Sequence, residues 1–363
     1  MYYYATKTGL PMFDACRAYG LALILERLGR VVESIEDVTI QDVGAMYLVQ
    51  GLALDEVKEI PTRDIFRDLV TLENPGWNQV LITNKRKDVE KKIARVDELL
   101  ENCTTLLSVF AQPTPCALQT KTPSGYESLP GSLDVCAFKG FRTDKLDKYN
   151  EGIELSTPEG HWALGLLGGA NFIYWTWIGG KFDDKAGLLP VPQSITLTNH
   201  RQIKSIAEAG KLSRVSMAVV AAHYAVRLAD AIRGKRATRT IIADRYSDLI
   251  VQELAQTGTG ITKSWKAKSG SLFPMELLMS LVDKNENTSA EVLRLWKQLF
   301  DYGNNKGKEM IAITLADLIA HPSLESAESH FRVHLRASLK DKWELRDALY
   351  PTDCLQEVMH HVR

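Results

Sequence analysis

The stretch LLPVP, residues 188–192, divides the sequence into two parts of different character. Before it, short segments with strand propensity alternate with turn residues and with long loops rich in Pro and Gly. After it, alanine-rich segments with helical spacing of apolar residues dominate, and few strand patterns remain. A chain of 363 residues also exceeds the size at which one hydrophobic core usually keeps growing. The sequence therefore predicts an α+β protein with domains at 1–192 and 193–363.

The first part predicts a mixed domain with small antiparallel sheets. Pro11 opens a helical pattern that continues to Gly29, and short strands are expected at 37–41 and 45–50. Residues 85–102 have opposite charges three and four positions apart and apolar residues on one side, which indicates an amphipathic helix. Residues 111–160 collect prolines and glycines, so long loops on a sheet are expected there.

Two runs with strand propensity, 161–169 and 170–180, meet at Gly168-Gly169, which predicts a hairpin. The aromatic residues around Trp175 would give this hairpin a hydrophobic surface for docking on other proteins. The second part predicts a helical bundle. Its expected helices are at 212–233, 240–256, 273–283, 289–302, 315–319, 325–339 and from Leu345 onward.

Composition indicates an ordinary folded protein of the cytoplasm. The apolar run Gly20–Leu25 is flanked by charged residues and is far shorter than the roughly 20 residues that a membrane span needs. It also lacks the pattern of a signal peptide. The five cysteines form no CxxC pair, so reduced and mostly buried thiols are expected rather than disulfides or a zinc site.

The common motifs of catalysis and cofactor binding do not occur in the sequence. No glycine-rich segment continues into the Gly-Lys-Ser/Thr of a phosphate-binding loop, and neither G-x-S-x-G nor HExxH is present. His330 and His334 are one helical turn apart but lack a third ligand of matching spacing, so they are expected to be surface or half-buried residues. Asp183-Asp184 is expected to be a solvated turn. We therefore predict no catalytic residue, no metal and no cofactor.

Positive charge is concentrated in the second part. Residues 201–268 hold 13 Lys and Arg against five Asp and Glu, although the whole chain has a net charge of only -1. Each cluster alone could be a solvated helix end. Three clusters in one bundle favour contact with nucleic-acid phosphates that does not depend on base sequence. The candidate residues are Arg201, Lys204, Arg233, Lys235, Arg236, Arg239, Lys263, Lys266 and Lys268.

The layout of an N-terminal helix with small strands, long loops and a basic helical bundle resembles the large subunit of type I CRISPR surveillance (Cascade) complexes. The opening segment TGLPMFDACRAYGLA, residues 8–22, is similar to the start of the compact members of that family. The resemblance covers most of the chain but includes no short diagnostic motif.

The resemblance implies a non-catalytic, DNA-binding subunit of an antiviral defence complex. Its N-terminal domain would recognise the protospacer-adjacent motif in duplex target DNA, and its helical bundle would stabilise the R-loop and the displaced single strand. Its partners would be a guide RNA-containing complex with backbone and other small subunits. A separate effector nuclease or transposition protein would act afterwards, because the chain carries no nuclease signature.

One loop in the first part has residues suited to reading the DNA motif. Gln119 and Lys121 can hydrogen-bond the edges of bases, and Gly125 permits close approach of the backbone. Ser124 and Tyr126 complete the candidate set. The alternative interpretation is an ordinary solvated loop.

Two other functional classes remain open at this point. One is an α/β enzyme with a helical lid that uses His161 with Asp183 or Asp184, which tight binding of a divalent metal would favour. The other is a protein-interaction scaffold, which would not bind DNA or RNA even at low salt. The residues determine neither the sequence of the recognised motif nor the CRISPR subtype. They also do not identify the docking partners, or show whether the system cleaves DNA or directs transposon insertion.

Overall fold

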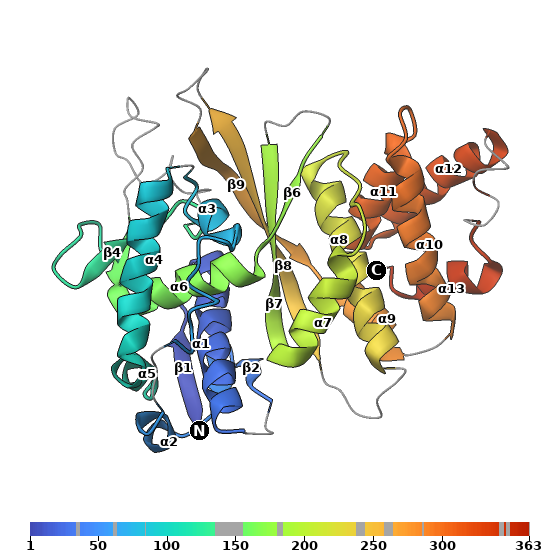
Figure 1. Cartoon of the computed structure of the whole chain (residues 1–363). Coiled ribbons are helices and arrows are strands. Elements are labelled where there is room, and N and C mark those ends of the chain that lie inside the picture. Colours follow the sequence, from blue (N-terminus) through green and yellow to red (C-terminus); the bar gives the residue numbers. More distant parts are fainter. Residues whose placement is uncertain are drawn as a thin grey trace. The chain divides into compact units, whose positions relative to one another are not determined.

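A computed structural model gives the fold of most of the chain. It describes residues 1–33, 37–60, 64–83, 85–134, 155–179, 184–236, 244–257, 264–284, 287–340, 345 and 349–362, without the side chains of Arg236, Thr257, Ser264 and Lys266. The protein has the predicted α+β fold (Figure 1). Within the described residues, no helix combines the length and the apolar character that crossing a membrane requires.

The chain forms two units and passes between them five times. Unit 1 consists of Met1–Trp175, Val191–Thr198 and Gln252–Ser271. Unit 2 consists of Thr176–Pro190, Asn199–Val251 and Leu272–Arg363. One of the crossings falls between Pro190 and Val191, inside the stretch that divides the sequence pattern.

Unit 1 contains most of the short elements of the chain. Its elements are β1 (Tyr2–Thr6), α1 (Pro11–Val31), β2 (Thr39–Asp42), β3 (Met46–Gln50), α2 (Leu54–Lys58), α3 (Gly76–Val80), α4 (Arg86–Glu101), α5 (Cys103–Phe110), β4 (Tyr126–Ser128), β5 (Ser156–Pro158) and α6 (Glu159–Phe172). The predicted helix from Pro11, the strands near 37–41 and 45–50, and the amphipathic helix at 85–102 are confirmed as α1, β2, β3 and α4.

The centre of unit 1 is the pair α1 and α6, which pack closely against each other (Figure 1). Glycines permit this approach. A Cβ atom on Gly20 would lie 2.1 Å from the carbonyl oxygen of Leu164, and one on Gly168 would lie 1.9 Å from that of Cys16. Both distances are far below any real Cβ contact, so the two backbones are in direct van der Waals contact. Most of α1 is buried as a result.

Unit 2 is mainly helical. Its helices are α8 (Met217–Arg236), α9 (Glu276–Lys284), α10 (Asn287–Gly303), α11 (Glu309–Ala320), α12 (Leu324–Lys340) and α13 (Thr352–His360). Helix α8 contacts α9, α10 and α11, and α11 also packs against α12. The helical spacing of apolar residues predicted these helices, most of which bury one apolar face, whereas the middle of α8 is buried on all sides.

Several elements have residues in both units. They are β6 (Tyr174–Trp177), β7 (Asp184–Thr196), α7 (Leu197–Glu208), β8 (Arg245–Thr257) and β9 (Ser264–Pro274). The larger sheet has the strand order β1-β3-β2-β7-β8-β9, and β6 pairs with β7. Within unit 1, β2 is antiparallel to β7, with Ile40 opposite Ile195. A separate two-stranded sheet joins β4 and β5.

The predicted hairpin at Gly168-Gly169 is wrong, because these residues lie inside helix α6. In a strand pattern a Gly-Gly step is typical of a turn. Here the glycines serve packing instead, since a Cβ on Gly169 would lie 2.7 Å from the side chain of Val80. Tertiary contact with α1 and α3 therefore overrides the local turn signal.

The expectation that strands nearly end at residue 192 is also wrong. Strand β7 continues through Pro190 and Pro192 to Thr196, and the predicted helix at 240–256 is strand β8. Tyr246, Leu249 and Ile250 each expose 1% or less of their surface. This burial is typical of a strand that is covered on both faces. Residues 249–252 of β8 are all buried, so the alternation of buried and exposed residues that distinguishes a strand from a helix is lost there.

Of the four described cysteines, none forms a disulfide, and Cys16, Cys103 and Cys354 are buried, as expected. Burial raises the pKa of the Cys354 thiol to about 11 and that of Cys103 to about 12. These thiols are therefore protonated at neutral pH and act as small apolar residues.

Candidate nucleic-acid interface

The loop that carries the predicted motif-reading residues has a fixed backbone. Gln119 and Ser156 exchange two backbone hydrogen bonds, of 2.9 and 2.8 Å. The hydroxyl of Ser156 also donates to the carbonyl oxygen of Lys121, at 2.5 Å. At the far end of the loop, the backbone N–H of Glu159 donates to the carbonyl of Gly125, which has φ +80°. The loop is therefore attached to β5 and to the start of α6.

The side chains of this loop point to solvent. Gln119, Lys121 and Ser124 are exposed, and Tyr126 is half-buried at the start of β4. Within the described part of the chain, the Gln119 amide and the Lys121 ammonium have no hydrogen-bond or ion-pair partner. Gln119 forms an isolated β-bridge with Ser156, and the chain bends at Thr120 and Lys121. The loop thus offers an amide and a cation for external contacts.

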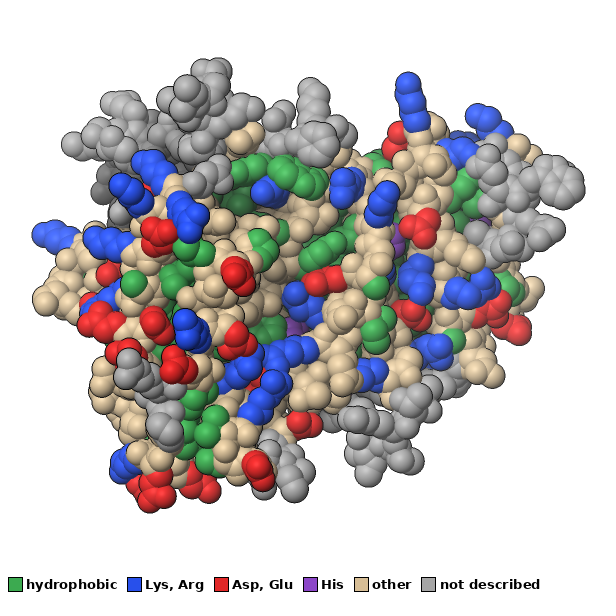
Figure 2. All heavy atoms as spheres, in the orientation of Figure 1, with side chains coloured by type: hydrophobic (Ala, Val, Ile, Leu, Met, Phe, Trp, Pro, Cys, Tyr) green, Lys and Arg blue, Asp and Glu red, His purple; other side chains and the backbone are tan. Residues whose placement is uncertain are grey.

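The described acidic residues next to the loop pair with helix α4 rather than with Lys121. Glu127 on β4 accepts a bond of 2.5 Å from Lys92, and Glu159 pairs with Arg95. The Lys92 ammonium also lies 5.0 Å from the centre of the Trp162 ring. In Figure 2 the region of α4 shows Lys and Arg side chains intermingled with Asp and Glu. Helix α4 is therefore a mixed-charge surface rather than a basic patch.

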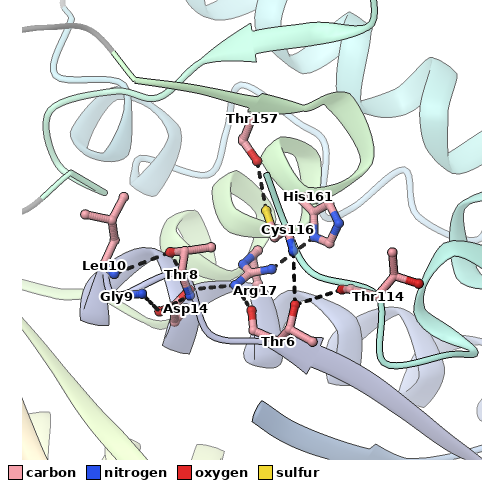
Figure 3. Close-up of polar contacts among 10 residues, drawn as sticks. All are labelled: Thr6, Thr8, Gly9, Leu10, Asp14, Arg17, Thr114, Cys116, Thr157 and His161. Atoms are coloured by element: carbon pink, nitrogen blue, oxygen red, sulfur yellow. Dashed lines mark hydrogen bonds and ion pairs between the residues drawn. The ribbon is translucent and has the colours of Figure 1, made fainter. Parts of the chain in front are cut away.

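Beneath the loop lies a buried polar network centred on Arg17 of α1 (Figure 3). Its guanidinium donates 2.6 Å to the carboxylate of Asp14 and 2.5 Å to the carbonyl of Thr6. The other terminal nitrogen lies 3.0 Å from Nδ1 of His161. Asp14 in turn accepts bonds from the backbone N–H groups of Thr8 and Gly9. The network therefore joins the end of β1, the start of α1 and the first turn of α6.

His161 is held as a neutral acceptor. Burial and, secondarily, the positive charge of Arg17 lower the pKa of His161 to about 3. Arg17 can only donate, so Nδ1 of His161 accepts and its proton resides on Nε2. The ring also meets Phe110 edge to face at 4.6 Å. In this environment the imidazole has a fixed packing role and does not change its charge near neutral pH.

The residues of the open enzyme hypothesis belong to separate elements of the chain. His161 belongs to the network around Arg17, Asp183 lies outside the described residues, and Asp184 begins β7. Among the described residues, no three His, Cys, Asp or Glu side chains form a group able to hold a metal ion. His330 and His334 are buried, with exposed fractions of 0% and 7%, which corrects the surface or half-buried placement. His330 bonds Tyr350 at 2.9 Å in the interior of unit 2.

Four buried neutral histidines give a stability prediction. Burial is the main cause that lowers the pKa of His161, His223 and His330 to about 3 and that of His200 well below 6.5. The unfolded chain binds these protons near pH 6.5, so it holds more protons than the folded protein as pH falls toward 3. We expect the free energy of unfolding to drop by about 2 kcal/mol per histidine between pH 7 and pH 5. Chemical denaturation at several pH values measures this.

The matched variant for this prediction is His161→Gln. It removes one titrating group, so its stability should depend less steeply on pH than that of the parent protein. Constant stability of the parent between pH 7 and pH 5 would contradict the neutral assignment.

In unit 2, two of the predicted phosphate-binding lysines on α7 and α8 have partners within the protein. Lys235 near the end of α8 donates 2.7 Å to the side-chain oxygen of Asn199 near the start of α7. Asn199 donates 2.7 Å to the buried carboxylate of Asp244. Lys204 pairs with Glu208 at 2.9 Å. These lysines are thus partly occupied by contacts within the protein.

The remaining cations of the prediction have varied surroundings. Arg201 and Arg233 are half-buried, and Lys268 is exposed but pairs with Glu253 at 2.6 Å. Lys268 lies on strand β9, and the side chains of Lys268 and Ser269 both bond Glu253 of β8. Lys263 and Arg239, and the side chains of Arg236 and Lys266, lie outside what the structure describes.

Sequence reasoning located the loop but missed the residues beneath it, namely Thr6, Asp14, Arg17 and Thr157. One signal was available. Asp14 and Arg17 are three positions apart and are the two charged residues within the buried stretch 12–25 of α1, and such a pair in a buried helix must bond within the protein. Both residues lie in the segment 8–22 on which the family resemblance rests.

Comparison with known proteins adds one relative. The chain is 27% identical over 376 residues to an uncharacterized protein of Archaeoglobus fulgidus, and the similarity spans 99% of this chain and 98% of that protein. No family model matches the sequence.

Proposed function

We propose that the chain is a non-catalytic, cytoplasmic subunit of an RNA-guided DNA-targeting complex. In this proposal it corresponds to the large subunit of a type I Cascade, and the loop 119–126 recognises the protospacer-adjacent motif in duplex DNA. In such complexes the guide RNA reads the target, and protein reads the short adjacent motif and the backbone. The complex supplies the guide RNA and the backbone subunits, and a separate nuclease or transposition protein acts afterwards.

The observation that carries the proposal is the way the loop presents Gln119 and Lys121. An exposed amide and an exposed ammonium, without partners in the described residues, extend from a backbone fixed by Ser156 and Gly125. Base edges in the major groove are read by side chains of this kind, and reading requires that their geometry be fixed before binding.

The cations of α7 and α8 suit a second, less specific role. Arg201 and Lys235 lie on helices whose ends meet at Asn199. They would contact phosphates of the target or displaced strand, which strengthens binding without reading sequence. Because Lys235 already bonds Asn199, its contribution would come through charge more than through a new hydrogen bond.

The first experiment asks what the protein assembles with. Affinity purification from the native host should bring along a short RNA of uniform length and a backbone subunit present in several copies. Recovery of the chain without RNA, together with absence of DNA binding at low salt, would favour the scaffold alternative.

The second experiment tests motif reading in the assembled complex. Lys121→Ala should weaken binding to a target with the correct adjacent motif by about 5- to 150-fold, because a good base contact is worth about 1–3 kcal/mol. Targets with an altered motif should be affected little. The matched control is Lys87→Ala on α4, which removes another exposed lysine of unit 1. Equal losses for both variants on both targets would contradict motif reading.

The phosphate contacts predict a different response. Arg201→Gln or Arg233→Gln should weaken binding to all sequences alike and reduce the slope of log affinity against log salt by roughly 0.7 to 0.9 per lost contact. Binding is measured at several salt concentrations for each variant. An unchanged slope after both substitutions would assign these residues to the solvated surface.

A further inference from the structure

The loop before Gln119 is held by one hydroxyl group. Thr6, the last residue of β1, donates from Oγ1 to the carbonyl of Thr114 at 2.9 Å, and the same oxygen accepts the backbone N–H of Cys116 at 3.2 Å. The single Thr6 hydroxyl thereby satisfies one carbonyl and one N–H group of the loop backbone. Figure 3 shows both contacts beside the network. A second contact joins the thiol of Cys116 to the hydroxyl of Thr157 at 3.1 Å.

Thr6 is itself fixed by the buried network. Arg17 is fully buried and donates 2.5 Å to the carbonyl oxygen of Thr6. Asp14 and His161 hold the same guanidinium from two other directions. The position of the Thr6 hydroxyl therefore follows from the packing of α1 against α6 rather than from the loop. A contact of this kind holds an exposed segment in a fixed position against the rigid interior.

A second clamp lies beyond the first. The hydroxyl of the fully buried Ser156 donates to the carbonyl of Lys121, and the Ser156 backbone pairs with Gln119. The two clamps thus bracket the segment from Cys116 to Lys121, and the exposed amide and ammonium extend from the end of it. Neither clamp uses Gln119 or Lys121 side-chain atoms, so both groups stay available.

We propose that Thr6 and Ser156 are positioning residues that determine specificity at the loop. They hold the backbone so that the Gln119 amide and the Lys121 ammonium meet base edges in one fixed arrangement, with Arg17 as the rigid support. This inference rests on the proposed function, because it assigns the loop to motif reading. It adds that the discrimination between correct and altered motifs depends on residues that never touch the DNA.

The test compares Thr6→Val with Thr8→Val. Valine keeps the shape of threonine and removes the hydroxyl. In Thr6→Val the loop loses both bonds to the hydroxyl on β1. Thr8→Val also removes two bonds, one donated to Asp14 at 2.9 Å and one accepted from the N–H of Leu10 at 3.3 Å, but neither involves the loop. Both side chains are half-buried, so the two substitutions are closely matched.

The first measurement is hydrogen exchange of the purified chain, without any DNA. Thr6→Val should speed exchange at the amide of Cys116 by about 5- to 10-fold, the change expected from the loss of one typical hydrogen bond. Thr8→Val should leave that amide unchanged. The second measurement is the affinity ratio between correct and altered motifs in the assembled complex. Thr6→Val should reduce this ratio about tenfold with little change for the altered motif, and Ser156→Ala should act in the same direction.

The outcomes distinguish a failure of the positioning role from a failure of the proposed function. If Lys121→Ala lowers the ratio but Thr6→Val speeds exchange without changing it, the loop reads the motif and the positioning role is overturned. If Thr6→Val leaves exchange at Cys116 unchanged, the clamp itself is overturned. If Lys121→Ala has no effect on the ratio, the assignment of the loop to motif reading fails, even where exchange shows that the clamp exists.

Discussion

Replacing Gly168 with alanine is expected to cost at least about 3 kcal/mol of stability, because the packing of α1 against α6 leaves no room for a methyl group. The added Cβ would lie 1.9 Å from the carbonyl oxygen of Cys16 and 2.9 Å from the backbone nitrogen of Gly20. Both neighbours are backbone atoms in a buried helix and cannot rotate away. The helices must separate, which opens the core of unit 1.

Chemical denaturation, with hydrogen exchange of the α1 and α6 amides, measures this effect. The control is Gly234→Ala in α8, where a Cβ would meet nothing within 4 Å. That variant should gain up to about 1 kcal/mol, since alanine favours a helix more than glycine does. A Gly168→Ala protein as stable as the parent would show that α1 and α6 do not pack as described.

Replacing Arg17 with methionine should destabilise unit 1 by about 3–5 kcal/mol, the usual cost of removing one partner from a buried ion pair. The carboxylate of Asp14, 2% exposed, would stay buried without its cation, and the Thr6 carbonyl would lose a donor. Urea denaturation of the variant and the parent at pH 7 gives the difference.

The double variant Asp14→Asn with Arg17→Met tests the cause. Removing the carboxylate charge together with the cation should restore part of the loss, because the uncompensated charge is then gone. If the double variant is less stable than the sum of the two single losses predicts, the charge pair is not the source of the effect.

The sequence predicted helices with one apolar face and also the long buried helix α1, but it gave α6 and β8 the wrong type of element. Helix α4 alternates charge and apolar residues with a clear period, so its limits were found almost to the residue. Helix α6 is buried nearly all round, as are residues 249–252 of strand β8, and such continuous burial removes the periodic signal that distinguishes a helix from a strand. The glycines of α6 then mimic a turn, although their use is close packing.

For the candidate interface, sequence reasoning found the side chains that point outward but not the ones that hold them. Gln119 and Lys121 are recognisable by residue type and by the nearby Gly125. The contacts of Thr6 to Thr114 and Cys116 join residues more than 100 positions apart, and no local pattern encodes such a pairing. The phosphate-binding prediction failed to foresee that Lys204, Lys235 and Lys268 have partners within the protein.

The pairing of β2 with β7 also affects how the protein can be made. During synthesis β2 leaves the ribosome with β1 and β3, but its partner Ile195 on β7 follows much later. At about 5–20 residues per second, this edge stays unpaired for on the order of ten seconds. An open strand edge is a template for aggregation, so the nascent chain needs protection during that interval. Faster translation between β3 and β7, or a chaperone that covers the edge, should therefore raise the yield of folded protein.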